Sequence, residues 1–251
     1  MRGSRAPNAP RRSCGRGCAT ARPARCGGAG ATARPRSKAQ LDDHAHVARA
    51  CLELFAATHA PLWLERALAV TDVMLARLWD DERGGFFENP TDAGGIRVRL
   101  KDGFDGAETA GNSIAAHVLE RLARLTGRDD LGEKARLTLR YHAARLVDHP
   151  SAMPQMVASM IEHLSPVRHV VIAGEDSPER ESLIAVYESK FRPFDDLVVV
   201  DDASREALAR LAPFTAACVA REGRPTAYVC VNHACRLPVH TPDALAAELE
   251  A

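Results

Sequence analysis

The first 40 residues contain no acidic side chain and scarcely any large apolar one, although they carry ten Lys or Arg residues. A segment of this composition cannot bury an apolar core, so we expect residues 1–38 to be disordered. Three interpretations of this leader are open: an organelle transit peptide, an arm that binds nucleic acid or membrane, or a spurious stretch from an upstream start site or a wrong reading frame. The three cysteines of the leader favour the last interpretation.

The chain also lacks long apolar runs. None is long enough to span a bilayer, and none has the apolar core of a secretory signal peptide. We therefore expect a soluble cytoplasmic protein, or an organellar one if the leader is a transit peptide, with no membrane partner. Beyond residue 40 the chain holds 23 basic and 33 acidic residues. Because the basic excess is confined to the leader and does not lie on a folded face, we expect no nucleic-acid partner.

Cysteines are odd in number, seven in all, which is not the dense, even set of a secreted disulfide scaffold. Cys230 and Cys235 are separated by four residues, so they do not match the redox Cys-x-x-Cys spacing. With His233 they supply three metal ligands, whereas a tetrahedral site usually needs a fourth. We interpret these cysteines as structural or incidental, with thiol redox chemistry as the minor alternative. We predict no metal and no cofactor.

Apolar residues recur at spacings of three and four from Leu41 to Leu164, which predicts a series of amphipathic helices. The first two cover residues 41–55 and 61–78. A second helical pair resembles the first at an offset of 68 residues, so that the Ala-Arg-Leu at 76–78 recurs at 144–146. A repeated helical hairpin is typical of stacked or ring-shaped α architectures.

The ends of the second pair carry their own signals. Asn112 or Ser113 can cap the third helix, and Gly127 ends it. Asp130 and Glu133 have the spacing of a capping pair for the fourth helix. A fifth helix is expected over residues 151–164.

After residue 165 the apolar pattern shortens. Apolar runs at residues 169–173, 197–200 and 227–231 alternate with helical segments, which predicts a small parallel α/β unit over residues 166–251. Residues 39–165 then form the helical part. No glycine-rich phosphate loop follows the first strand, and the acidic pair at positions 175 and 176 would repel phosphate. Nucleotide binding is therefore not expected.

The first candidate site lies at the start of the first helix, where Asp42, Asp43 and His44 follow one another. Two carboxylates and an imidazole can bind a hydroxyl-rich ligand or act as acid and base. The structural alternative is that acids in a first helical turn only interact favourably with the helix dipole.

The second candidate site lies in the loop before the third helix and comprises Asp102, Asp105, Glu108 and Asn112. Glycines between these residues let the backbone bend tightly and approach a ligand. The structural alternative is a solvated loop whose acids are neutralised by neighbouring basic side chains, with Asn112 as a helix cap. A glycosidase mechanism needs two facing carboxylates, about 5–5.5 Å apart for retention or about 6.5–9.5 Å apart for inversion.

Several motifs resemble the thioredoxin-domain-containing family related to spermatogenesis-associated protein 20. Residues 101–113 (KDGFDGAETAGNS) are similar to the family pattern Asp-Gly-Ala-Glu-Pro-Ser, a small residue, then Asn-Ser. Residues 41–45 (LDDHA) resemble its Leu-Asp/Glu-Asp-Tyr-Ala. Further motifs follow in the family's order, and the resemblance covers about residues 38 to 251: GFF at 85–87, AMPQM at 152–156, VVIAG at 170–174 and YVC at 228–230 with Cys235 and Pro238.

The resemblance implies that the chain corresponds to roughly the C-terminal third of such a protein. Intact members begin with a thioredoxin-like domain and continue into an (α/α)6 toroid, like those of six-hairpin glycosidases and N-acylglucosamine 2-epimerases. This chain departs from the family at Thr109 and Ala110, where the family has Pro-Ser, and at His44, where it has Tyr. Those departures affect loop rigidity and ligand contacts at these positions.

We predict a mainly α fold, a partial (α/α)6 toroid followed by a small α/β unit, which is inactive alone. If the intact relative is an enzyme, the ligand is carbohydrate-like, Glu108 and Asp43 are the acid/base candidates, and Asp105, His44 and Asn112 position the ligand. The rival hypothesis is a non-catalytic interaction module or scaffold. A partial ring leaves apolar helix faces uncovered, which favours self-association.

Overall fold

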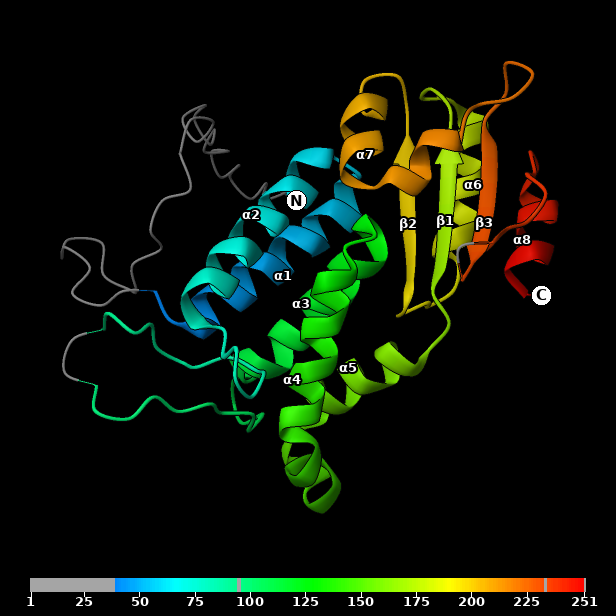
Figure 1. Ribbon diagram of the computed structural model, residues 1–251. Coiled ribbons are helices and arrows are strands. Elements are labelled where there is room, and N and C mark those ends of the chain that lie inside the picture. Colours follow the sequence, from blue (N-terminus) through cyan, green and yellow to red (C-terminus); the bar gives the residue numbers. More distant parts are fainter. Residues whose placement is uncertain (1–38, 94–95, 233, 251) are drawn as a thin grey trace, which may run out of the picture.

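The computed structural model describes residues 39–93, 96–232 and 234–250 (Figure 1). The expectation for residues 1–38 lies outside this part of the chain. The fold is mainly α, a partial α/α toroid of helical hairpins followed by a small α/β unit. The α-helices are α1 (Leu41–Thr58), α2 (Pro61–Leu78), α3 (Gly111–Thr126), α4 (Asp129–Asp148), α5 (Pro154–Leu164), α6 (Pro178–Glu188), α7 (Arg205–Leu211) and α8 (Pro242–Glu250). The strands are β1 (Arg168–Ala173), β2 (Asp195–Val200), β3 (Thr226–Val231) and β4 (Ala234–Cys235).

The helical part consists of two hairpins and a fifth helix. α2 packs on α1 and α4 packs on α3, while α3 lies between α1 and α5 (Figure 1). The predicted hairpins are confirmed, as is the stop signal of α3, because Gly127 adopts the left-handed conformation with φ 69°. The expected fifth helix is shorter than predicted, since a 3-10 turn at Pro150–Ala152 precedes α5.

The predicted helix starts in the second hairpin were wrong. α3 begins at Gly111, and its N-cap residue Ala110 offers no side-chain acceptor, so Asn112 and Ser113 lie inside the helix. The Asp130 carboxylate pairs with Arg128 and that of Glu133 pairs with Arg136, so neither caps α4. The spacing predicted that these carboxylates accept hydrogen bonds from backbone N–H groups, but they form ion pairs with neighbouring arginines instead.

The sheet has the order β2-β1-β3-β4, with β1 and β2 parallel and β3 antiparallel to β1. The prediction of a parallel unit therefore holds for the first two strands and is wrong for the third. The connection from β2 to β3 runs through α7, which has seven residues and spans about 10 Å. A six-residue strand spans about 20 Å. The connection also contains a 3-10 turn at Pro213–Ala217, so neither of its helical pieces runs the length of a strand. β3 enters the sheet at the end where β2 leaves it.

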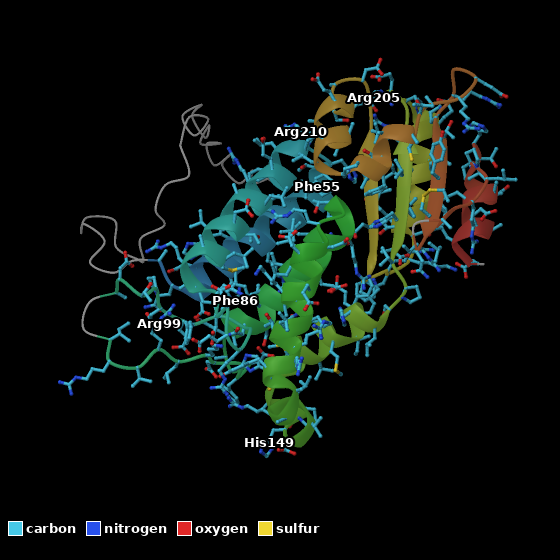
Figure 2. All side chains as sticks on the ribbon, in the orientation of Figure 1. Phe55, Phe86, Arg99, His149, Arg205 and Arg210 are labelled. Atoms are coloured by element: carbon cyan, nitrogen blue, oxygen red, sulfur yellow. A yellow bond between two sulfur atoms is a disulfide. The ribbon has the colours of Figure 1, made fainter. Side chains whose placement is uncertain are left out.

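One apolar core joins the helical part to the sheet. The same buried cluster contains Phe55 of α1, Leu119 of α3, Val198 of β2 and Leu208 of α7. Phe55 and Phe86 lie inside this core, whereas Arg205 and Arg210 lie on the outer side of α7 (Figure 2). A second cluster fills the opposite face of the sheet under α6 and α8. The α/β unit therefore covers part of the helical surface that a partial ring would leave open.

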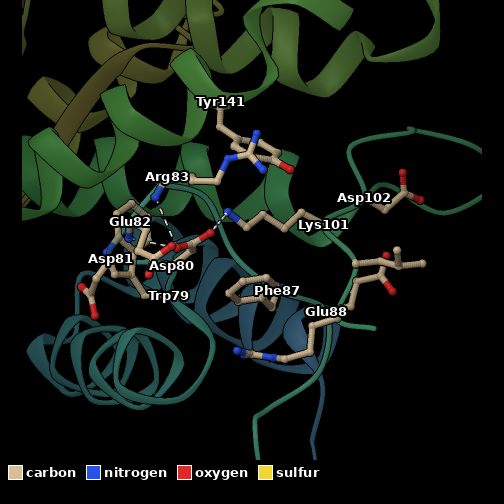
Figure 3. A pocket seen from close by; sticks show the side chains of 12 residues that line it. Trp79, Asp80, Asp81, Glu82, Arg83, Phe87, Glu88, Lys101, Asp102 and Tyr141 are labelled. Carbon is tan, nitrogen blue, oxygen red and sulfur yellow. Dashed lines mark hydrogen bonds and ion pairs between the residues drawn. The ribbon is translucent and has the colours of Figure 1, made fainter. Parts of the chain in front are cut away.

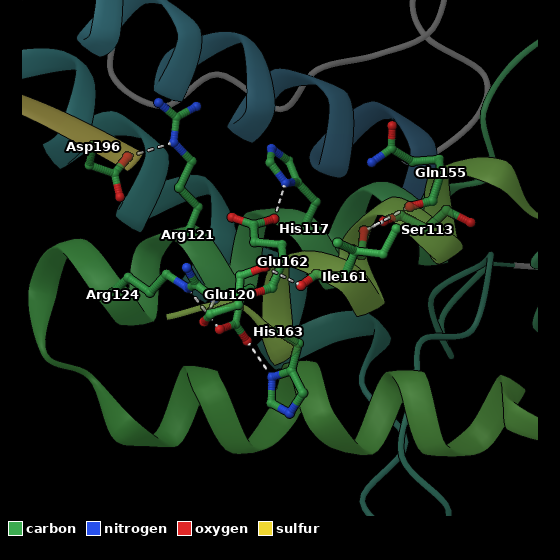
Figure 4. Close-up of polar contacts among 12 residues, drawn as sticks. Ser113, His117, Glu120, Arg121, Arg124, Gln155, Ile161, Glu162, His163 and Asp196 are labelled. Carbon is green, nitrogen blue, oxygen red and sulfur yellow. Dashed lines mark hydrogen bonds and ion pairs between the residues drawn. The ribbon is translucent and has the colours of Figure 1, made fainter. Parts of the chain in front are cut away.

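Ion pairs on α3 also tie the parts together (Figure 4). Arg121 Nε donates to Asp196 of β2 at 3.0 Å. On the side facing α5, Arg124 Nε donates to Glu120 at 3.0 Å, and His117 Nδ1 lies 2.7 Å from Glu162. Most of these side chains are buried, so breaking one partner would leave an uncompensated charge. The helix thus has a fixed rotation between α1, α5 and the sheet.

Cys230 and Cys235 are joined by a disulfide across the β3–β4 pair, while Cys51 and Cys218 are free and buried. This agrees with a structural role, and it removes both thiolates from the considered three-ligand set. The third member, His233, lies outside the described residues. None of the helices in the described part of the chain is both long and apolar enough to cross a membrane.

Candidate active site

The loop from Trp79 to Ala110 connects α2 to α3 and lies over the N-terminal ends of α1, α3 and α5. It encloses one side of a cavity of about 810 Å³ (Figure 3). This end of the helices is the one that faces away from the α/β unit (Figure 1). The lining residues are Trp79, Asp80, Asp81, Glu82, Arg83, Phe87, Glu88, Arg99, Leu100, Lys101, Asp102 and Tyr141. Aromatic rings with a few placed polar groups are the usual composition of a small-molecule site.

Lys101 connects several of the groups that form the floor of the cavity. Its ammonium group donates to the Asp80 carboxylate and, at 2.6 Å, to the carbonyl of Gly84. It also lies over two aromatic rings, 4.1 Å from the centroid of Tyr141 and 4.8 Å from that of Phe87. The Lys101 side chain is only 3% exposed. The ammonium group is therefore bound on all sides by protein groups, and it holds the rings of Tyr141 and Phe87 in place as walls of the cavity.

Glu88 and Asp102 line the cavity, and the nearby Asp42, which is not part of the lining, acts on Glu88 through its charge. Burial raises the pKa of Glu88, and the negative charges of Asp102 and Asp42 raise it further. Burial also raises the pKa of Asp42, a hydrogen bond from the Gly111 N–H opposes this, and the charges of Asp43 and Glu108 add to the rise. Carboxyls with raised pKa values next to other acids are the groups that serve as general acids.

Asp43 and His44, predicted for catalysis and ligand binding, serve the start of α1. One oxygen of Asp43 accepts the backbone N–H of Gln40 at 2.9 Å. His44 is buried, and its Nδ1 donates to the Gln40 carbonyl at 2.7 Å. Of the two adjacent acids Asp42 and Asp43, it is Asp42 whose pKa is raised by the negative charge of Glu108. Glu108 itself is exposed on the loop.

Asp105 and Asn112 organise the loop from within. The Asp105 carboxylate accepts the N–H groups of Ala110 at 3.0 Å and Gln155 at 2.8 Å, which ties the loop to the first turn of α5. Asn112 is fully buried. Its amide oxygen accepts from Phe86 N at 2.8 Å, and its nitrogen donates to the carbonyls of Phe86 and Asp102, each at 2.9 Å. Both side chains position the cavity walls.

Sequence reasoning missed Glu88 and Tyr141. Glu88 directly follows the aromatic residues Phe86 and Phe87, and this sequence pattern could have indicated an acid next to an aromatic wall. Tyr141 lies in the middle of α4 with no such signal. Among the described residues there is no cluster of three or more His, Cys, Asp or Glu side chains that could hold a metal ion.

Comparison with known proteins agrees with this architecture. Residues 33–153 match glycosyl hydrolase family 76. Spermatogenesis-associated protein 20 of Homo sapiens is 34% identical over 204 residues, which cover 80% of this chain and 26% of that protein. The protein of the same name from Rattus norvegicus is 33% identical over the same shares. The chain spans about a quarter of the length of the curated relatives it matches. Over most of its length the chain is therefore similar to spermatogenesis-associated protein 20, and its helical part resembles a glycosidase-like domain.

Proposed function

We propose that the cavity lined by Glu88 and Tyr141 binds a carbohydrate-like, polyhydroxylated ligand. The observation that carries the proposal is the position of Glu88, a carboxyl of raised pKa, beside fixed aromatic walls at one end of a glycosidase-like helical ring. Aromatic faces pack on the C–H surface of a sugar ring, and carboxyl groups hydrogen-bond its hydroxyls. Phosphorylated sugars are disfavoured, because acidic residues outnumber basic ones in the cavity wall.

The chemistry of the site follows from its two kinds of carboxyl. Glu88, kept protonated to a higher pH by its surroundings, is suited to give a proton to a leaving-group oxygen. Asp42 is the candidate for the second carboxyl, with Glu108 beside it on the loop. Asp43 is engaged in the start of α1, so we assign its predicted role to Asp42. Turnover would require the rest of the ring, and the chain alone binds without turning over.

The test is ligand binding by the full chain. Isothermal titration calorimetry with a panel of neutral α- and β-linked disaccharides should detect binding, and Glu88→Gln should weaken it about tenfold through loss of the carboxyl as a hydrogen-bond partner. Glu179→Gln is the matched control, because Glu179 is an exposed acid on α6 and does not line the cavity. Equal affinity of the Glu88 variant and wild type would remove Glu88 from the site.

A second candidate function is an interaction module that assembles with itself. Exposed apolar side chains lie at both ends of the helical arc: Val47 and Leu54 on α1, and Ile161 and Leu164 on α5, with Leu164 74% exposed. Such residues favour contact between the α1 edge of one copy and the α5 edge of another. Sedimentation velocity at rising concentration should then show oligomers that Leu164→Glu abolishes. A monomer at all concentrations contradicts this function.

A further inference from the structure

A second hollow lies at the opposite end of α1 from the proposed carbohydrate site. It has a volume of about 530 Å³ and separates the α1–α2 turn from the sheet. Its helical wall includes His59 and Pro61, and its α/β wall includes Arg180, Asp201 and Ser204. Since α1 has 18 residues and is therefore about 27 Å long, the two cavities are separate sites. This volume is within the range of small-molecule pockets.

The hollow lies beside the point where the sheet changes its winding. The chain leaves β1 through Gly174 and continues into α6, whose buried residues belong to the cluster on one face of the sheet. It leaves β2 through Asp201 and continues into α7, whose buried residues belong to the cluster on the other face. β1 and β2 are parallel, so both exits lie at the same edge. Crevices outside the carboxyl ends of strands, where successive helices take opposite faces, are the usual binding place in α/β folds.

Asp201 is the first residue after β2 and supplies a carboxylate to the hollow. Its Oδ1 accepts the Ser204 N–H at 2.8 Å, which fixes the carboxylate in place. Burial acts to raise the pKa of Asp201, but the hydrogen bonds from Ser204 outweigh it and the net pKa is lowered. The group is therefore ionised at neutral pH. An ionised carboxylate has lone pairs for further donors, such as two neighbouring hydroxyls.

Two buried nitrogen atoms in the walls have no hydrogen-bond partner among the described residues: Arg180 Nε and His59 Nδ1. The rest of the Arg180 guanidinium is held by the Gly174 carbonyl at 3.2 Å and by Asp176 at 2.9 Å. Unpaired buried groups of this kind call for an absent partner such as a ligand or water. Both nitrogens are covered by protein atoms within opposite walls of the hollow, so a ligand contacts them only if the two side chains turn toward it.

The charges around the hollow exclude a phosphate. Asp176 and Glu181 pair with Arg180, and Glu175 accepts the Asp202 N–H. These acids surround the turn after β1, where a dinucleotide fold would hold its pyrophosphate. Asp201 is placed like the carboxylate that hydrogen-bonds the ribose hydroxyls in dinucleotide folds, whereas the acids after β1 disfavour a bound anion.

From this arrangement we propose that the hollow binds a nucleoside without phosphate groups, with its ribose diol on Asp201 and its base between the His59–Pro61 turn and Arg180. The proposal does not depend on the carbohydrate site. Binding here would connect the α1–α2 hairpin to the α/β unit, since one ligand contacts both walls.

The test uses adenosine as the probe and the full chain as the protein. Isothermal titration calorimetry should detect adenosine binding, and 2′,3′-dideoxyadenosine should bind at least about tenfold more weakly, because it lacks both hydroxyls that face Asp201. AMP should also bind more weakly than adenosine. Comparison of these compounds on wild-type protein needs no variant that could fail to fold.

The variants sharpen the assignment. Asp201→Asn should weaken adenosine binding at least about tenfold, and Asp202→Asn, at the exposed neighbouring position, should leave it unchanged. Glu88→Gln should not affect adenosine, which separates this site from the carbohydrate site. No adenosine binding up to about 10 mM, equal affinity for the dideoxy compound, or AMP as tight as adenosine would each overturn the proposal.

Discussion

Lys101 and Asp80 form the ion pair that the cavity depends on. Their side chains are 3% and 10% exposed, so each is costly to leave without the other. Burial acts to raise the pKa of Asp80, but hydrogen bonds from Lys101 and from the N–H groups of Glu82 and Arg83 outweigh it, and the net pKa is lowered. A carboxyl with a lowered pKa in the folded state stabilises the fold above its unfolded pKa of about 3.9, and this contribution fades as the pH falls below that value.

Lys101→Met should therefore destabilise the protein by about 3 kcal/mol at pH 7, because it leaves the Asp80 carboxylate buried without its partner. At pH 3 the difference from wild type should shrink, since Asp80 becomes neutral in the variant. Urea unfolding at both pH values measures this. Lys134→Met is the control, because Lys134 only lies over the Trp79 ring at 4.5 Å, and its cost should stay below about 1 kcal/mol at both pH values. A pH-independent penalty for Lys101→Met would contradict the role of Asp80.

Asn112 and Asp105, which the sequence suggested for positioning a ligand, hold the loop before α3 in its conformation. Both use their hydrogen-bonding capacity on backbone groups of the loop and of α5. The carboxylate of Glu88 and the rings of Phe87 and Tyr141 line the cavity itself. Polar type and spacing therefore drew attention to this loop, whereas only the folded structure shows which group each polar atom contacts.

At the scale of the elements, two glycines with left-handed backbone conformations end or turn the hairpins. Gly84 has φ 73° and Gly127 has φ 69°, so any other residue would suffer similar backbone strain at either position. A Cβ on Gly127 would meet nothing within 4 Å, whereas one on Gly84 would lie 3.0 Å from the Cβ and carbonyl oxygen of Leu137. Gly84 thus combines a turn with a close approach of the loop to α4.

Gly127→Ala should cost about 1 kcal/mol of unfolding free energy, the penalty for a left-handed alanine. Gly84→Ala should cost about 1–3 kcal/mol more, because overpacking against α4 adds to the same penalty. Each variant is the control for the other in guanidinium unfolding. Equal costs would show that the loop can move away from α4, and the wall near Tyr141 would then not be rigid.

At the scale of the whole molecule, the helical part and the α/β unit share one buried cluster. Leu208 of α7 is fully buried in it, next to α2. Both tryptophans, Trp63 and Trp79, lie on or beside α2, so their fluorescence reports on the helical part alone. A shared core predicts that the two parts unfold together.

Leu208→Ala should cost about 2–5 kcal/mol by leaving a cavity. The fluorescence and far-ultraviolet circular dichroism transitions should shift together by the same amount, although the substitution is outside the helical part. Leu237→Ala, at a position 85% exposed, should shift neither by more than about 0.5 kcal/mol. A fluorescence midpoint unchanged by Leu208→Ala would show that the two parts unfold separately.

The sequence by itself determined the helices and the strands, because apolar periodicity and turn residues such as Gly127 act over a few neighbouring residues. The tertiary structure alone decided what depends on distant parts of the chain. It gathered Asp42, Glu88 and Asp102 into one group and brought Tyr141 over Lys101. It also made β3 antiparallel to β1, with α7 and a 3-10 turn between β2 and β3. Pairing partners and strand direction are set by which elements meet in space, and local periodicity carries no information about that.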